Sequence, residues 1–169
     1  ILLATKKSGE KLNLEDDEKS KFDSYRKKLV NNEINLLDIC IKEDLLLSTA
    51  NIAPLSHWIT PNIESRRFDT RFFIAYLPEK QIVEHDGLEL TQSLWINPNK
   101  AVEMAFKGEM QMIMPTIKNL QSCSEFEVAK DMLDSQKRLT NKDIPPILPK
   151  FFKENGNWVG LLPGDDGYE

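Results

Sequence analysis

A chain of 169 residues, 40% of them apolar and including eight Phe and three Trp, is long enough to bury one hydrophobic core. Its net charge of −5 and pI near 5.2 disfavour a nucleic-acid-binding surface, because phosphate groups are bound by a basic face. No apolar stretch approaches the roughly 20 residues that a membrane-spanning helix requires. We therefore expect one soluble domain with appendages that binds neither nucleic acid nor membrane.

The first part of the chain contains a charged linker followed by helical patterns. Phe22, Tyr25 and Leu29 recur at intervals of three and four, and the same spacing returns after two asparagines. The sequence therefore predicts amphipathic helices over about 16 to 31 and 33 to 43.

Two β signals follow these helices. Residues 68–77 alternate between two faces that both become apolar after Phe72, which predicts a strand covered on both sides. The dipeptide Asp86-Gly87 separates two β-prone runs, residues 80–85 and 88–96, and it suits a tight turn because glycine tolerates positive φ. We expect a β-hairpin around this dipeptide.

The rest of the chain predicts further helices and a tail. Asn97 followed by proline is typical of a helix start, and Gly108 is placed to end that helix. Another helix is predicted to begin at Ser124, because Glu127 completes a capping-box pattern with it. Prolines and glycines beyond residue 139 predict an extended C-terminal tail. Helices that alternate with strands favour an α/β or α+β fold with helices over a mixed sheet.

The cysteines and histidines form no recognisable disulfide, metal-binding or catalytic motif. Cys40 and Cys123 lie far apart in apolar, helix-like contexts, which is typical of reduced thiols rather than of a disulfide framework. Neither His57 nor His85 has a second His, Cys or carboxylate at a metal-ligand spacing. We expect a structural hydrogen bond at His57 and an exposed position beside a turn at His85. The sequence also lacks phosphate-binding glycine motifs and the context of an activated nucleophile.

The run RRFDTRFFIAYLP, residues 66–78, places three arginines at the entrance of the predicted strand. Arg66, Arg67 and Arg71 could form structural ion pairs, and Asp69 lies on the same strand face as Arg71 with about 7 Å between the two Cα atoms. A planar guanidinium also binds phosphate through two parallel hydrogen bonds, so the same arginines are candidate ligands of an anionic substrate. The residues alone leave both explanations open.

Several motifs together resemble one protein family. HWITP, RRFDTRFFIA, DGLEL, LWINPNKAV and MPTIKNL, spread over roughly residues 56–121, resemble the C-terminal half of a Nudix hydrolase. The subgroup that they resemble contains the peroxisomal coenzyme A diphosphatase and its bacterial relatives. The segments PPILPKFF and NWVGLLPGDDGY are similar to the ending of that family. The motifs are specific as a set, although each alone is weak.

The resemblance implies a fold and a domain organisation. The expected fold is a partial Nudix-type α/β/α sandwich with a mixed sheet. Residues 1–138 would form the C-terminal portion of the Nudix domain, and residues 139–169 a Pro/Gly-rich tail. Within the domain, residues 68–77 resemble a central strand and residues 89–95 the next one. The helices over about 16–43 resemble an inserted element that covers the cleft.

The resemblance also implies a metal-dependent hydrolase. Glutamates of the Nudix box hold Mg²⁺ or Mn²⁺ in this family, and such ions neutralise phosphate charge and activate the attacking water. The sequence contains no Nudix box. We therefore expect the metal ligands upstream of Ile1, none in this chain, and an inactive chain when it is isolated.

The site residues that the resemblance implies lie on the substrate side. Arg66, Arg67 and Arg71 are candidate substrate ligands, and Glu89 is a candidate catalytic residue that assists the metal cluster from outside the box. The expected reaction of the parent protein is hydrolysis of the pyrophosphate bond in a small, coenzyme A-like nucleoside diphosphate. The alternative is a non-catalytic Nudix-like binding or structural module in which the arginines form only salt bridges. Without a signal peptide, a membrane span or a C-terminal peroxisomal signal, the chain is expected in the cytoplasm.

Overall fold

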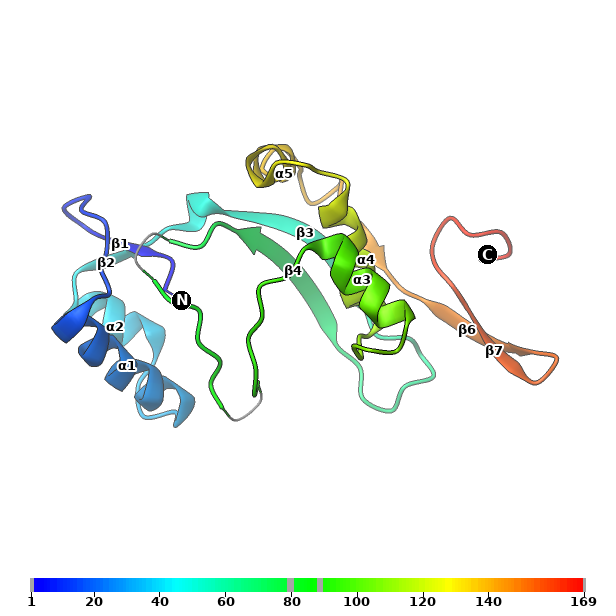
Figure 1. Cartoon of the computed structure of the whole chain (residues 1–169), viewed down its shortest axis with the longest axis horizontal. Helices are drawn as coiled ribbons and strands as arrows, with labels where there is room; N and C mark the ends of the chain where they lie inside the picture. Colours follow the sequence, from blue (N-terminus) through cyan, green and yellow to red (C-terminus); the bar gives the residue numbers. More distant parts are fainter. Residues whose placement is uncertain (1, 79–80, 88–89, 169) are drawn as a thin grey trace. The chain divides into compact units, whose positions relative to one another are not determined.

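The structure, a computed structural model, describes residues 2–78, 81–87 and 90–168 (Figure 1). The described residues combine helices with a mixed β-sheet, which confirms the predicted mixed α/β class. None of the described helices has the length and apolar character needed to cross a lipid bilayer.

The chain divides into two compact units. The described residues of Ile1–Ile52 and Ala75–Trp95 form the first unit, and those of Ala53–Ile74 and Ile96–Glu169 form the second. Each unit therefore contains segments that are distant in sequence.

The first unit combines two helices with a two-stranded antiparallel sheet in which Ala4 lies opposite Leu47. The helices lie close to the predicted ranges of about 16–31 and 33–43, so both helix predictions are confirmed. The elements of this unit are β1 (Ala4–Lys6), α1 (Asp16–Val30), α2 (Leu36–Lys42), β2 (Leu45–Leu47) and the short 3-10 helix η1 (Thr49–Asn51).

Local signals set the break between α1 and α2. Asn32 adopts a φ of 59°, a left-handed conformation that ends α1 and that asparagine tolerates better than most residues. The Asn35 side chain then accepts a hydrogen bond from the Asp38 amide at 2.9 Å, and the Asp38 carboxylate accepts one from the Asn35 amide at 3.1 Å. This reciprocal capping box fixes the start of α2.

The core of the first unit lies between α1, α2 and the small sheet. Ile39 and Leu45 are 2% and 3% exposed, and burial of such a side chain contributes about 1.5–3 kcal/mol. The rings of Phe22 and Tyr25 meet edge-on with centroids 5.7 Å apart. Cys40 is buried in this core as a free thiol. Cys123 in the second unit is free as well, which confirms the prediction of unpaired cysteines.

A carboxylate at the end of α2 joins three elements of the first unit. The Glu43 side chain, only 11% exposed, accepts hydrogen bonds from Lys21 Nζ and from the Tyr25 hydroxyl, both at 2.6 Å. Its backbone carbonyl accepts a hydrogen bond from Lys6 Nζ at 3.2 Å. The hydrogen bonds from Lys21 and then Tyr25 hold the pKa of the Glu43 carboxyl below its ordinary value of 4.5.

The second unit is built on a three-stranded sheet with strand order β4-β3-β5. β4 runs antiparallel to β3 (Figure 1), and β5 runs parallel to β3 with His57 opposite Pro146, so the sheet is mixed. The elements of this unit are β3 (Ile52–Ile59), β4 (Asp69–Ala75), α3 (Pro98–Phe106), α4 (Met114–Ser124), α5 (Ala129–Gln136), β5 (Pro146–Ile147), β6 (Lys150–Glu154) and β7 (Asn157–Leu161).

Helix α4 is attached to the sheet by a polar contact. The Ser56 hydroxyl on β3 donates a hydrogen bond to Asn119 Oδ1 on α4 at 2.6 Å, and Asn119 is buried. Helices α3 and α4 lie side by side (Figure 1), and Ala101 of α3 is completely buried. One face of β3, the face that carries Ser56, is therefore covered by helix.

The start of α3 agrees with its prediction, whereas the next predicted helix start is wrong. Asn97 Oδ1 accepts a hydrogen bond from the Asn99 amide at 2.9 Å, and Gly108 adopts positive φ just after the helix. Ser124, however, is the last residue of α4, and its hydroxyl donates to the Gln121 carbonyl at 2.6 Å. Because this hydroxyl serves the preceding turn, it does not cap a following helix.

Of the hairpin predicted around Asp86-Gly87, the described residues form only the turn. The turn exists, since Gly87 has a φ of 74° and its amide donates to the Leu90 carbonyl at 2.9 Å. Residues 81–87 and 90–96 form no strand, so the hairpin prediction is wrong for the described residues. Here the Glu84 carbonyl accepts a hydrogen bond from the Arg26 side chain on α1 at 2.8 Å.

Strand β4 confirms the strand predicted over 68–77 but not its burial. Among the described residues, β4 lies at the edge of the three-stranded sheet and not at its centre, and Phe73 is 58% exposed.

The predicted extended tail also contains regular structure, because β6 and β7 form an antiparallel hairpin. Asn155 and Gly156, both with positive φ, close this hairpin in the manner of a tight two-residue turn.

We expect Glu43→Gln to lower the free energy of unfolding by about 2 kcal/mol at pH 7, because the hydrogen bonds to a charged carboxylate are weakened. The folded-state pKa of Glu43 is lowered, so this stabilisation is complete above the ordinary, unfolded-state pKa of 4.5 and is lost as the pH falls through the folded-state value. Urea denaturation of both proteins between pH 7 and pH 2 measures the difference.

Glu10→Gln is the control for this comparison, since Glu10 is an exposed carboxylate of the same unit. It should leave the urea midpoint nearly unchanged at every pH. Equal effects of the two substitutions would show that the contacts of Glu43 do not stabilise the unit.

Candidate functional site

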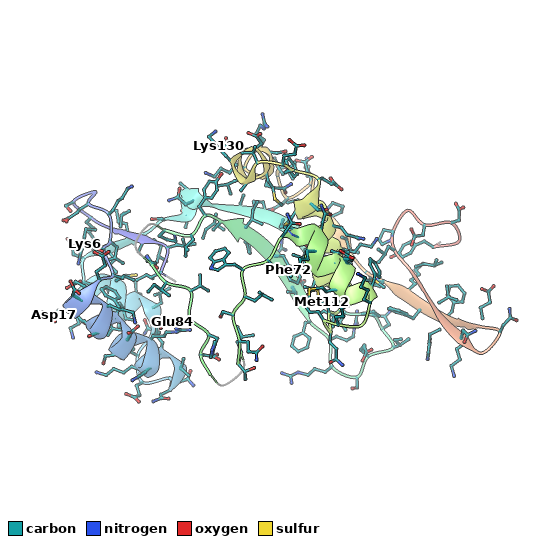
Figure 2. The ribbon with its side chains drawn as sticks, viewed as in Figure 1. Lys6, Asp17, Phe72, Glu84, Met112 and Lys130 are labelled. Carbon is teal, nitrogen blue, oxygen red and sulfur yellow. The ribbon has the colours of Figure 1, made fainter. Side chains whose placement is uncertain are left out.

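The three arginines of the RRFDTR run are all exposed and belong to the second unit. Arg66 and Arg67 end the loop between β3 and β4, and Arg71 lies within β4. Phe72, labelled in Figure 2, marks the middle of this strand.

Arg67 has a structural contact at the base of the loop. Its Nε donates a hydrogen bond to the Thr60 carbonyl at 2.9 Å. The Thr60 amide donates to the Phe68 carbonyl, and the Phe68 amide donates to the Thr60 hydroxyl, both at 2.9 Å. These three hydrogen bonds close the loop and set the point where β4 begins.

Arg66 lies over an aromatic ring. Its guanidinium carbon is 5.0 Å from the centroid of the Phe68 ring, which is the geometry of a cation–π contact. Such a contact is worth about 0.5–1 kcal/mol at an exposed position. The stacked guanidinium keeps its N–H groups at the surface, so the contact orders Arg66 without consuming its donors.

Asp69 pairs with a histidine and not with the neighbouring arginine. Nε2 of His57 on β3 donates to Asp69 Oδ1 at 2.5 Å. His57 is 8% exposed, whereas the Asp69 side chain is 63% exposed. The structural hydrogen bond predicted at His57 is thereby confirmed. Its partner was not predicted, although His57 and Asp69 flank a single short loop that joins neighbouring strands.

The His57–Asp69 pair shows which face of the sheet carries Arg71. Because His57 contacts Asp69, these two side chains share a face, and Arg71 lies two residues beyond Asp69 on that face. Ser56, the neighbour of His57, points to the opposite face and bonds α4. Arg71 therefore lies on the face of the β3–β4 pair opposite to α4.

Arg71 differs from the other two arginines in its contacts. It forms no hydrogen bond or ion pair with any residue that the structure describes. Its guanidinium presents five N–H donors in a fixed fork, which suits a phosphate or carboxylate group. The candidate site consists of this open face of β4, with Arg71 as its centre and Arg66 and Arg67 at its loop end.

The described residues do not form a metal site. Over residues 2–78, 81–87 and 90–168, no three His, Cys, Asp or Glu side chains are placed to hold a metal ion. Asp69, the carboxylate nearest to Arg71 in sequence, accepts a hydrogen bond from His57. The donor set of this part of the chain thus does not fit Mg²⁺ or Mn²⁺. Glu89, the predicted catalytic candidate, lies outside the described residues.

Comparison with known proteins supports the family that the motifs indicated. Residues 1–122 match the family model described as the NUDT19 Nudix domain. Over 160 residues the chain is 26% identical to the acyl-coenzyme A diphosphatase NUDT19 of Xenopus laevis, with coverage of 90% of this chain and 41% of that protein. Over 147 residues it is 26% identical to the acyl-coenzyme A diphosphatase NUDT19 of Homo sapiens, with coverage of 86% of this chain and 39% of that protein.

The chain spans about two fifths of the length of these curated relatives. No solved structure matches it. The family match nevertheless includes β1 to α3, the loop with Arg66 and Arg67, and the strand with Arg71. Since the match covers well over half of its residues, the chain belongs to the NUDT19 Nudix domain family.

Proposed function

We propose that this chain forms the substrate side of a diphosphatase that hydrolyses the pyrophosphate bond of a coenzyme A-like nucleoside diphosphate. The observation that carries the proposal is the guanidinium of Arg71, which is exposed on the open face of β4 and has no partner among the described residues. Family membership supports pyrophosphate hydrolysis as the reaction class, and both relatives are named acyl-coenzyme A diphosphatases.

The arginines divide the work of binding a diphosphate. Arg71 binds one phosphate group by donating two parallel N–H hydrogen bonds. The spacing of these donors on the planar guanidinium matches that of two phosphate oxygens. Arg66, ordered by the Phe68 ring, adds positive charge at the loop end. Arg67 uses Nε to close the loop and keeps its terminal N–H groups for the substrate.

The divalent ions belong to another part of the proposed site. Mg²⁺ or Mn²⁺ would act as a Lewis acid on the diphosphate. Because the described residues contain no fitting donor set, we propose that the complete natural protein holds these ions with residues other than those described here. Glu89 is proposed to assist that cluster, on the resemblance of its position alone. The described residues bind and orient the substrate.

The pairing of the cysteines supports a reducing location. Cys40 and Cys123 are both free thiols. Free thiols persist where glutathione and thioredoxin keep cysteines reduced. We therefore propose the cytoplasm as the working location.

Arg71→Ala in the complete natural protein should raise the KM for a coenzyme A diphosphate at least about tenfold, because a charge-assisted hydrogen bond is worth about 1.5–3 kcal/mol. The unfolding temperature should not change, since Arg71 has no partner to lose among the described residues. Steady-state kinetics and thermal unfolding measure the two quantities. Arg71→Lys should recover part of the affinity through its charge, but not all of it.

Arg138→Ala serves as the matched control, because Arg138 is another exposed arginine of the second unit. It should leave the KM within about twofold of wild type, a change below 0.5 kcal/mol or so. An unchanged KM for Arg71→Ala would remove Arg71 from the substrate site.

Chelation tests the proposed metal dependence. EDTA should abolish hydrolysis by the complete natural protein, and excess Mg²⁺ or Mn²⁺ should restore it, because the Lewis acid is supplied by the ion. Chromatographic separation of the two phosphomonoester products, the adenosine nucleotide and 4′-phosphopantetheine, from intact coenzyme A reports the turnover. Full activity in EDTA would contradict metal dependence. Tight coenzyme A binding without turnover in either metal would favour the alternative, a non-catalytic binding module.

A further inference from the structure

His57 contacts the carboxylate that lies two residues before Arg71 on the same strand face. Nε2 of His57 donates to Asp69 Oδ1 at 2.5 Å. The histidine is 8% exposed, whereas Asp69 and Arg71 are both exposed. Packing therefore fixes the imidazole, and the two exposed side chains can rotate except where a contact restrains them.

The pairing of β3 with β4 also brings His57 next to Arg71. The Thr60 amide donates to the Phe68 carbonyl at 2.9 Å, so these two residues lie opposite each other at the end of the strand pair. In a regular antiparallel pair, each step back along one strand corresponds to one step forward along the other. This count places His57 opposite Arg71, with Asp69 on the diagonal. The three side chains thus form one cluster on the face that does not carry α4.

Asp69 has two possible partners in this cluster. Its α-carbon is about 7 Å from that of Arg71, and two side chains of these lengths can bridge this span. An ion pair between them would have to order a long exposed arginine, which costs side-chain entropy. The buried imidazole of His57 is already ordered, so its hydrogen bond to the carboxylate carries a smaller cost. Arg71 has no ion pair with any described residue.

We propose that His57 is a positioning residue of the diphosphate site, because it holds the Asp69 carboxylate away from Arg71 and keeps that guanidinium available to a phosphate group. The inference rests on the proposed function, since His57 acts on the substrate only through Arg71. A neutral imidazole with its proton on Nε2 is sufficient, because such a ring donates a hydrogen bond without carrying charge. All three residues belong to the second unit.

A double-mutant cycle on the complete natural protein tests this role. His57→Phe keeps an aromatic ring at the buried position but removes the donor, and Asp69→Asn removes the charge of the carboxylate. Titration calorimetry gives the Kd for coenzyme A, and steady-state kinetics with Mg²⁺ or Mn²⁺ give KM and kcat. His85→Phe is the matched control, because His85 is an exposed histidine of the first unit. It should leave all three constants within about twofold of wild type.

His57→Phe should raise Kd and KM about threefold to fivefold, because the released carboxylate then competes for Arg71 with the strength of an exposed ion pair. The kcat should stay within about twofold, since the chemical step is unaffected. Asp69→Asn should lower KM at least about threefold more in the His57→Phe background than in wild type. His57→Gln retains an N–H donor and should keep the wild-type KM. His57→Leu repeats the test with a smaller side chain if the phenyl ring does not fit.

Unchanged Kd and KM in His57→Phe and His57→Leu would overturn the proposal. An equal effect of Asp69→Asn in both backgrounds would also overturn it, because the carboxylate would then act only by repulsion of the substrate. A KM that stays raised in the double variant would show that His57 only supports the strand pair. Failure of the proposed function gives a different result. In that case coenzyme A is not hydrolysed and Arg71→Ala leaves its Kd unchanged, whereas failure of the positioning role alone leaves the effect of Arg71→Ala intact.

Discussion

The hydrogen bond between His57 and Asp69 is the contact on which the candidate site depends. It orients the Asp69 carboxylate, which lies two residues from Arg71 on the same strand face, toward His57, and Arg71 forms no ion pair with any described residue. It also joins β3 to β4 through a histidine that is almost fully buried. A buried imidazole needs a hydrogen-bond partner, because an unsatisfied polar group in the interior is costly. The constraint that stabilises the strand pair is thus the same one that leaves an arginine available.

This arrangement explains why one short run contains so many guanidinium groups. The sequence left open whether they serve structure or an anionic substrate, and the contacts show that the three arginines are not equivalent. Arg67 closes the loop through the Thr60 carbonyl, and Arg66 lies on the Phe68 ring. Arg71 has neither kind of contact among the described residues. Arg66 and Arg67 therefore have structural contacts, and Arg71 is the arginine that no such contact explains.

Sequence reasoning succeeded where the signal is local and failed where distant contacts decide. The helices α1 and α2 follow from the spacing of apolar residues, and the start of α3 follows from the Asn97 cap, since both depend on neighbours within one or two turns. The strands predicted around Asp86-Gly87 are absent from residues 81–87 and 90–96, where the Glu84 carbonyl accepts a hydrogen bond from the distant Arg26 side chain on α1. The exposure of β4 and the pairing of Asp69 with His57 depend on which strand lies beside β4. Periodicity within one strand contains no information about that neighbour.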